Sequence, residues 1–298
     1  MTSITIGIPF VRNRDTIADA IRSVFAQTWQ DWQLLLVDDG SCDGSLEVAR
    51  AVSDPRVRVL TDTTNRGLPA RLNQIVANAK TDLVARLDAD DMMHPERLAR
   101  QVAALTADPT IDVVGTGMYA VDAAGELVGV MESRSAVTAP IDVLAKGILA
   151  HGTIVAKRTW FERHPYDARY PRAEDRELWC RTYRTSRFHG LAEPLYFVRL
   201  GPGPETLRKY RASCRDNRAL YRAYGPQMGG WLATGRLLLE AHLKEQVFTA
   251  MTLAGQQGAL LRRRSAPASP RDRADAERAL RVIRGTKVPG LEVRLPSS

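Results

Sequence analysis

Two clusters of carboxylates in the sequence have the residue types and the spacing to bind a cation. Asp88 and Asp90 are separated by one residue and follow an apolar run that ends at Leu87. In an extended turn both side chains can face one divalent ion. An all-oxygen ligand set suits Mg²⁺ or Mn²⁺, which usually complete their coordination with substrate phosphates. A second pair, Asp38 and Asp39, ends another apolar run.

Each cluster alone also has a structural interpretation. Asp91 or His94 can simply begin the helix that is expected from Pro95 onward. The turn after Val37 contains Asp and Gly in their usual turn positions. Two clusters at the ends of neighbouring parallel strands favour a site, because such sheets bind ligands outside the carboxyl ends of their strands.

The elements that would position these carboxylates alternate strictly over the first 115 residues. Apolar runs rich in β-branched residues predict strands at 4–9, 32–37, 57–60, 83–87 and 111–114. Segments with apolar residues at helical spacing lie between them, at 15–27, 45–52, 69–79 and 95–105. This order predicts an α/β fold with a parallel, doubly wound sheet.

The pattern changes in the remainder of the chain. From residue 120 to residue 205 the strict alternation is lost. Short strands are expected at 117–121, 153–156 and 195–199, and a helix is expected at 174–185. From Glu205 onward the pattern is helical, with a linker rich in Pro and Ser. The expected helices cover 207–224, 230–255 and 272–284, and the linker covers 265–271.

Composition excludes several classes of protein. The chain has 298 residues, of which 44% are hydrophobic and 26% charged, as in soluble globular proteins. It has no apolar run of about 18 residues, which a membrane-spanning helix requires, and its N-terminus lacks the basic region of a signal peptide. Its three scattered cysteines are too few for a disulfide framework or a zinc site. We therefore expect a reducing, cytoplasmic location.

The formal charge of +8 is concentrated in the C-terminal third. Residues 205–298 contain 18 basic and 8 acidic residues, a net charge of +10, whereas residues 1–204 carry a net charge of −2. This excess is either a solvated arginine-rich surface or a surface that meets phosphate, an anionic membrane or nucleic acid. A module that only binds nucleic acid or a membrane would leave the acidic strand ends unexplained.

Several common nucleotide and hydrolase motifs are absent. The chain has no Gly-x-Gly-x-x-Gly after the first expected strand, no Gly-x-x-x-x-Gly-Lys-Ser/Thr and no Gly-x-Ser-x-Gly. Their absence disfavours dinucleotide-linked redox chemistry, P-loop hydrolysis and serine hydrolysis. A sugar-1-phosphate nucleotidyltransferase remains an alternative, but it would need a Gly-rich basic loop where residues 9–14 contain no glycine.

A set of short segments gives the chain a resemblance to a known family. Over residues 3–200 it resembles family 2 glycosyltransferases with the GT-A fold. The matching segments are Ile8-Pro9, Gln27-Thr28, Val37-Asp38-Asp39-Gly40-Ser41, Asn65-Arg66-Gly67, Ala70-Arg71-Leu72-Asn73, Leu87-Asp88-Ala89-Asp90-Asp91 and Ala173-Glu174-Asp175-Arg176-Glu177-Leu178-Trp179. The order and spacing of these segments as a set are highly specific.

The resemblance implies a fold and a division of the chain. We expect a Rossmann-like GT-A domain over residues 1–204, with a mostly parallel sheet flanked by helices. Its nucleotide-binding half would cover residues 1–115 and its acceptor-binding half residues 116–204. Residues 205–298 would form a basic, helical C-terminal region.

The resemblance also implies roles for residues of the nucleotide-binding half. Asp39 would accept a hydrogen bond from the base, and Arg71 would lie near the base or the diphosphate, unless it is only a surface residue of a helix. Asp90 would be the direct ligand of Mn²⁺ or Mg²⁺, with Asp88 near the ribose or the metal. The expected nucleotide-sugar site is Pro9, Phe10, Val11, Asp39, Arg71, Asp88, Ala89 and Asp90.

In the acceptor half, Asp175 matches the family's general base, although Asp is also a good helix N-cap. Glu174 is its nearest rival. Trp179, four residues after Asp175, either stacks on sugar or belongs to the core, and His151, expected to begin a strand, either lines the acceptor pocket or is structural. Arg199 could reach the phosphates, but the histidine that follows this segment in many relatives is missing.

These assignments predict an inverting glycosyltransferase that uses a nucleoside diphosphate sugar, with UDP as the expected nucleotide. The acceptor would be a glycan, a lipid-linked glycan or a small molecule. The Gln-x-x-Arg-Trp signature of processive synthases is absent, so we expect one transfer per encounter. The basic region would contact the inner face of the membrane peripherally or support a homo-oligomer, and we expect no nucleic-acid partner.

Overall fold

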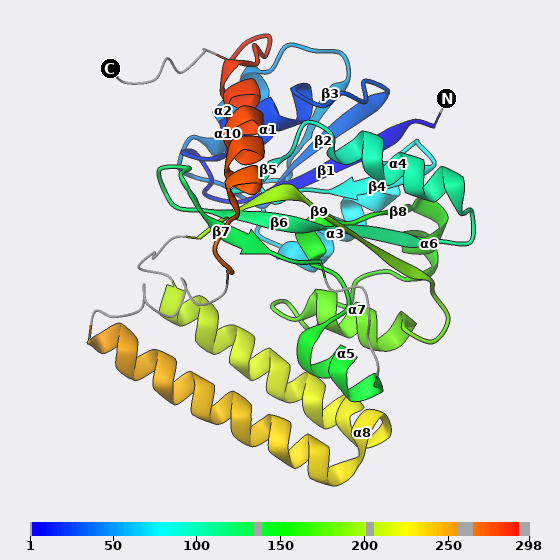
Figure 1. Cartoon of the computed structure of the whole chain (residues 1–298), viewed down its shortest axis with the longest axis vertical. Helices are drawn as coiled ribbons and strands as arrows, with labels where there is room; N and C mark the ends of the chain where they lie inside the picture. Colours follow the sequence, from blue (N-terminus) through cyan, green and yellow to red (C-terminus); the bar gives the residue numbers. More distant parts are fainter. Residues whose placement is uncertain (1, 134–138, 201–205, 255–264, 292–298) are drawn as a thin grey trace.

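The centre of the protein is a mixed sheet, with nine strands in the described residues. The structure is a computed structural model, and it describes residues 2–133, 139–200, 206–254 and 265–291 (Figure 1). The strands run in the spatial order β3-β2-β1-β4-β8-β6-β9-β5, and β7 pairs with β6. They are β1 (Ile4–Phe10), β2 (Trp32–Asp38), β3 (Val57–Leu60), β4 (Leu83–Arg86), β5 (Met92–Met93), β6 (Val113–Val121), β7 (Leu127–Met131), β8 (Val155–Lys157) and β9 (Phe188–Arg199).

The first four strands form the parallel half that the sequence predicts. β1 pairs in parallel with β2 and β4, and β2 pairs in parallel with β3. The strand expected at 111–114 does not continue this order. It is the start of the nine-residue β6, and β8 lies between β4 and β6, antiparallel to both. The sheet is therefore mixed, while the predicted α/β architecture is confirmed.

Helices cover both faces of the sheet. Ile4, Ile6 and Ile8 of β1 are fully buried in a core shared with α1 and α4, and Leu35 and Val37 of β2 belong to a second core with α3, α5 and α7. The helices before the C-terminal region are α1 (Ile17–Phe25), α2 (Ser45–Ala51), α3 (Leu68–Asn78), α4 (Arg97–Ala107), α5 (Pro140–Lys146), α6 (Arg158–Arg163) and α7 (Glu174–Thr182).

The strand expected to begin near His151 begins later in the structure. His151 to Thr153 form a 3₁₀ turn, and the strand covers only Val155–Lys157. The turn forms because both the backbone N–H and the hydroxyl of Thr153 donate to the carbonyl of Ala150, at 3.0 and 2.7 Å. Such local bonds compete with a sheet ladder. The consequence is that His151 lies in a turn next to β4 and β6 rather than in a strand.

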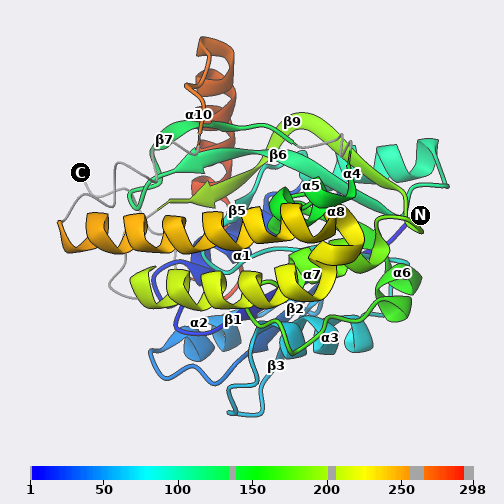
Figure 2. The ribbon, with the colours of Figure 1, turned by 90° about the horizontal axis from the view of Figure 1, so that it is seen from below.

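In the described residues 206–254 and 265–291 of the C-terminal region there are two separate helical parts. Helix α8 (Thr206–Leu253) breaks at Gly230, whose φ of 79° is not helical, and folds into two arms, residues 206–229 and 231–253 (Figures 1 and 2). Helix α10 (Pro270–Gly285) begins in a capping box between Ser269 and Asp272. It packs over the edge of the sheet formed by β5, β6 and β9, on the opposite side of the molecule from α8.

Candidate functional site

A cavity of about 730 Å³ opens at the carboxyl ends of β1, β2 and β4. We expected the two acidic clusters to end neighbouring strands. Instead they lie on either side of β1, because β2 and β4 each pair with β1 and not with each other. The lining residues are Pro9, Phe10, Val11, Arg12, Asn13, Asp39, Asn65, Gly67, Leu68, Arg71, Asp88, Ala89, Asp90, Pro171, Arg172, Arg208 and Lys209. Every residue of the expected nucleotide-sugar site is among them.

Asp39 fixes the loop that forms one end of the cavity. Its carboxylate accepts backbone hydrogen bonds from Arg66 (2.7 Å) and Gly67 (3.1 Å), and a side-chain bond from Arg71 Nε (2.8 Å). Gly40 makes the preceding turn possible, because its φ is 79° and a Cβ there would lie 3.1 Å from the backbone nitrogen of Asn65. The side chain of Asp38 stays in this turn, bonded to the Ser41 N–H.

Arg71 is a buried brace of the cavity wall. Its five N–H groups donate to Asp39, to both oxygens of Asp62, to Gln74 and to the Thr64 carbonyl. A guanidinium has only these five donors. The hydrogen bond from Arg71 holds the pKa of Asp62 at about 2, so this ion pair persists at neutral pH. Arg71 thus shapes the site with its donors already satisfied.

Asp88 is clamped by the buried Arg86. Two parallel bonds of 2.8 and 2.7 Å run from the guanidinium to the two carboxylate oxygens, the strongest geometry for such a pair. Burial alone would lower the pKa of Arg86, but the facing Asp88 raises it, so Arg86 stays charged. The clamp leaves Asp88 exposed on the cavity side, with a side-chain accessibility of 33%.

Asp90 and Asp91 crowd against Asp88. Burial and the charge of Asp88 raise the pKa of Asp90. Burial and the charges of Asp90 and Asp88 raise the pKa of Asp91 well above its usual value. A cation near Asp88 and Asp90 would relieve this repulsion. The described residues hold no group of three His, Cys, Asp or Glu side chains arranged to bind a metal, so further ligands would have to come from water or substrate.

Strand β9 holds the loop of Asp88 to Asp91 in place. The Tyr196 hydroxyl donates to Asp91 Oδ2 at 2.8 Å, and the Arg199 backbone N–H donates to Asp91 Oδ1 at 2.8 Å. The Arg199 guanidinium donates to the carbonyls of Asp90 and Ala123 and forms an ion pair with Asp19. Arg199 is therefore placed as a support for the loop, and it does not line the cavity.

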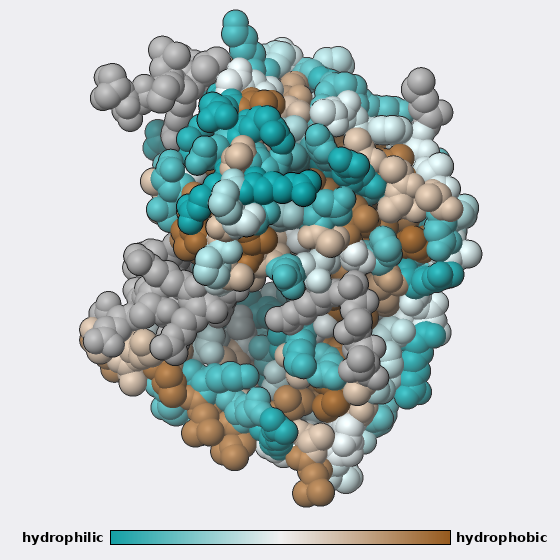
Figure 3. All heavy atoms as spheres, in the orientation of Figure 1, coloured by the Kyte–Doolittle hydropathy of each residue, from teal (hydrophilic) through white to brown (hydrophobic). Residues whose placement is uncertain are grey.

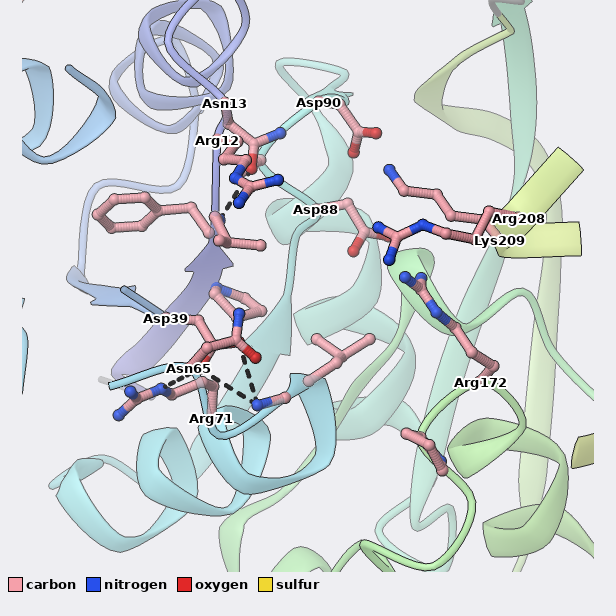
Figure 4. Close-up of a pocket in the computed structure, with 17 residues that line it drawn as sticks. Arg12, Asn13, Asp39, Asn65, Arg71, Asp88, Asp90, Arg172, Arg208 and Lys209 are labelled. Atoms are coloured by element: carbon pink, nitrogen blue, oxygen red, sulfur yellow. Dashed lines mark hydrogen bonds and ion pairs between the residues drawn. The ribbon is translucent and has the colours of Figure 1, made fainter. Parts of the chain in front are cut away.

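Basic side chains face the carboxylates across the cavity. Figure 4 shows Arg172, Arg208 and Lys209 pointing toward Asp88 and Asp90 from the opposite side. Arg172 precedes α7, whereas Arg208 and Lys209 lie in the first turn of α8. We call these three residues the basic wall, and Asp39, Asp88 and Asp90 the acidic wall. A ligand with a cation next to a diphosphate would match both walls.

A neutral polar cluster lies beneath the acidic wall. His151 Nε2 is 2.7 Å from the Tyr166 hydroxyl, and its Nδ1 is 3.8 Å from Glu174 Oε1. Burial and Arg86 lower the pKa of His151 well below its usual value. Burial and the neighbouring Asp175 raise the pKa of Glu174 to about 8. At neutral pH both groups are therefore mainly uncharged, and His151 has a structural partner.

Asp175 lies in the first turn of α7, half-buried, and it is not part of the cavity lining. The N-cap of α7 is Ala173, without a side-chain cap bond, so Asp175 does not serve as that cap. Trp179, one turn later, is fully buried among aromatic rings of the core. This confirms the core interpretation of Trp179 over stacking on sugar.

Comparison with known proteins agrees with this geometry. The sequence model of glycosyl transferase family 2 matches residues 5–172. The putative glycosyltransferase EpsE of Bacillus subtilis is 33% identical over 217 residues, which cover 70% of this chain and 77% of EpsE. The chain belongs to glycosyl transferase family 2.

Solved structures share the fold of this glycosyltransferase. TarS residues 1–349 of S. aureus in complex with UDP has a TM-score of 0.56 at 19% identity, over 80% of this chain and 70% of TarS. The mannosyltransferase PcManGT from Pyrobaculum calidifontis, in complex with GDP-Man and Mn²⁺, has a TM-score of 0.57 at 17% identity, over 94% of this chain and 85% of PcManGT. At these identities the likeness shows the fold.

Several residues that line the cavity of this glycosyltransferase are not predicted from the sequence. Among them are Arg12 and Asn13 after β1 and the three residues of the basic wall. A signal for Arg12 was available, because it directly follows the expected Pro9 to Val11 segment. The sequence indicates Arg208 and Lys209 only as part of a basic C-terminal third, since nothing in their local sequence indicates that α8 returns to the strand ends.

Proposed function

We propose that this glycosyltransferase moves a sugar from a nucleoside diphosphate sugar to an acceptor hydroxyl, with inversion at the anomeric carbon. The observation that carries the proposal is the pairing of the acidic and basic walls across one cavity at the strand ends. The acidic wall suits a divalent cation, and the basic wall suits the phosphates that such a cation would bridge. UDP is the proposed nucleotide, which accords with the TarS complex.

The donor set of the acidic wall fits Mn²⁺ or Mg²⁺. Asp90 would be the direct ligand and Asp88, held by Arg86, the second carboxylate. All donors are oxygen, as hard divalent cations prefer. When bound, the cation would neutralise the negative charge that grows on the departing nucleoside diphosphate. The Mn²⁺ in the PcManGT complex accords with this assignment.

Asp175 is the proposed general base. As the acceptor oxygen bonds to the anomeric carbon, the bond from that carbon to the diphosphate oxygen breaks, and the acceptor proton passes to the Asp175 carboxylate. Glu174 is the weaker candidate because its pKa of about 8 keeps it protonated at neutral pH. Attack from the side opposite the leaving group would invert the configuration and give a β-linkage from an α-linked donor.

The proposed acceptor is a hydroxyl of a glycan, a lipid-linked glycan or a small molecule. A reducing, cytoplasmic setting is part of the proposal, supported by three cysteines that are all free thiols. The nucleotidyltransferase alternative loses its support, because the matched family transfers glycosyl groups.

Asp175→Asn tests the proposal when binding and turnover are measured on the same preparation. Thermal shifts with UDP, dTDP, GDP and CMP, with and without Mn²⁺, identify the nucleotide, since a bound ligand raises stability with its concentration. We expect a Mn²⁺-dependent shift with one diphosphate in both proteins. Turnover should fall about 10³-fold in the variant alone.

The matched control is Asp167→Asn, another carboxylate that precedes α7 in the chain and forms an ion pair with Arg169. It should retain turnover. If Asp175→Asn also retained turnover, Asp175 would not be the base. If no nucleotide diphosphate stabilised the protein with Mn²⁺, the proposed donor class would be wrong.

A further inference from the structure

The second arm of α8 is apolar on two opposite faces. Phe248 and Ala241 are buried toward the first arm. On the other side, Leu232 is 93% exposed and Leu243 is 53% exposed. We call the exposed residues Leu232, Leu239, Leu243 and Val247 the outer stripe, because their spacing of seven and four residues places them along one helical face.

The outer stripe continues at both ends of the arm. Trp231, at the turn between the arms, is 80% exposed, and Leu253, in the last turn, is 81% exposed. Figure 3 shows apolar residues along the lower edge of the molecule, over this arm, with hydrophilic residues directly beside them. Exposed apolar side chains gathered along one helical face commonly mark an interaction site.

Arginines border this surface from the first arm. Arg211, Arg215 and Arg222 are exposed and lie on one helical face, four and seven residues apart. Arg211 donates to Thr249 of the second arm, and Arg218, on the same face, forms an ion pair with Glu245. These contacts place the arginine row next to the second arm. Residues 206–229 hold six basic side chains and one acidic side chain.

We propose that the outer stripe and the arginine row dock on an anionic lipid surface. A helix that lies in a membrane interface buries an apolar face with an aromatic residue and places basic side chains against anionic headgroups. The charge argues against a second copy of the chain as the occupant, because it would bring two arginine rows together in a protein of net charge +8. None of the helices in the described ranges is long and apolar enough to span a membrane.

Docking would also orient the cavity. Arg208 and Lys209 of the basic wall lie in the first turn of the same helix that displays the arginine row. A membrane bound along α8 would therefore lie next to one rim of the cavity. The docking proposal does not depend on the donor or on the base, because vesicle binding can be measured without turnover.

Co-sedimentation of the full chain with lipid vesicles tests the proposal. Phosphatidylcholine vesicles with about 30% phosphatidylglycerol should bind the protein at low salt, and pure phosphatidylcholine vesicles should bind it much more weakly. High salt should weaken binding, since exposed charges are screened. Binding should also shift the fluorescence of Trp231 to shorter wavelength, because the exposed indole enters an apolar environment.

Two sets of variants separate the apolar and the basic contributions. Leu239→Glu combined with Leu243→Glu should weaken binding at least about tenfold, since both side chains leave the lipid. Arg215→Glu combined with Arg222→Glu should remove the preference for anionic vesicles. Val282→Glu is the control. It makes the same kind of apolar-to-acid change at an exposed position of α10, and it should leave binding unchanged.

Three results would overturn the proposal. One is a lack of binding to anionic vesicles at low salt by the folded full chain. Another is an equal loss of binding in Val282→Glu and in the Leu239 and Leu243 variant. The third is self-association in sedimentation velocity that the Leu239 and Leu243 changes abolish while vesicle binding persists, which would assign the surface to a second copy.

Discussion

The carboxylates on one side of the cavity are held by the strands of the sheet and the loops that follow them, whereas the basic side chains on the other side come from segments outside the sheet. Asp88 is clamped by Arg86, two residues earlier, and Asp39 binds the Arg66 and Gly67 backbone. Arg208 and Lys209 reach the cavity from the first turn of α8. The acidic wall is thus built into the sheet, and the basic wall depends on how α8 packs.

The largest expected effect comes from removing Arg86, the counter-charge that holds Asp88 in the acidic wall. Arg86→Met should destabilise the fold by about 3–5 kcal/mol, because Asp88 would be left next to Asp90 and Asp91 without its buried counter-charge. The free energy of unfolding from urea denaturation measures this. Adding Asp88→Asn to Arg86→Met should recover part of the loss, and no recovery would show that Arg86 acts through packing alone.

A change in the acidic wall itself should remove activity rather than stability. Asp90→Asn should lower kcat/KM about 10²–10³-fold, equivalent to about 3–4 kcal/mol, because the cation loses its proposed direct ligand. Isothermal titration of Mn²⁺ with the nucleotide, together with initial rates, checks this. Asp108→Asn, which alters a carboxylate far from the cavity lining, should behave like the unchanged protein. Unaltered Mn²⁺ dependence in Asp90→Asn would remove it from the ligand set.

The basic wall should be more tolerant. Lys209→Met should weaken nucleotide diphosphate binding about tenfold, or about 1.4 kcal/mol, with little change in kcat. The reason is that its ammonium is solvent-exposed and lies beside two other cations. Nucleotide titrations at low and high salt measure the effect. Lys244→Met, an exposed lysine of the second arm of α8, is the control, and equal effects of both changes would mean that only net charge matters.

The smallest expected effect is a pH dependence of stability from the cluster beneath the acidic wall. Glu174 holds its proton up to about pH 8 in the folded protein, but loses it near 4.5 when unfolded. The folded state therefore binds more protons between these values, so stability falls as pH rises through this window. Glu174→Gln should flatten this slope, because its neutral amide neither binds nor releases a proton in this window. Melting curves at pH 5 and pH 8 test it, and an unchanged slope would assign the pH dependence elsewhere.

The sequence predicts the acidic wall because its signals are local. Apolar runs that end in carboxylates mark the carboxyl ends of β2 and β4, and a sheet brings such ends together. The sequence does not predict the pairing of β8 between β4 and β6, since antiparallel insertion leaves no periodic signature in a three-residue strand. The expectation that His151 begins a strand is wrong for another reason, because Thr153 bonds back to the Ala150 carbonyl and forms a turn.

The basic wall and the polar cluster required three-dimensional information. Arg172 looks like a solvated charge in the sequence, yet it points across the cavity toward Asp88. Arg71 was expected near the base or the diphosphate, and it lines the cavity, but its donors are used by Asp39, Asp62, Gln74 and Thr64. Spacing alone cannot distinguish a guanidinium that binds a ligand from one that is satisfied by its own loop.

The packing of α10 has a consequence for how the chain is made. Ala276, Leu280 and Ile283 cover Met92, Tyr119 and Phe197, and Pro289 accepts a backbone bond from Ser53. During synthesis these apolar surfaces of the sheet stay uncovered until α10 has left the ribosome. Nascent chains of this enzyme should therefore depend on chaperones until residues 270–285 emerge, and removing residues 270–291 should yield protein that aggregates.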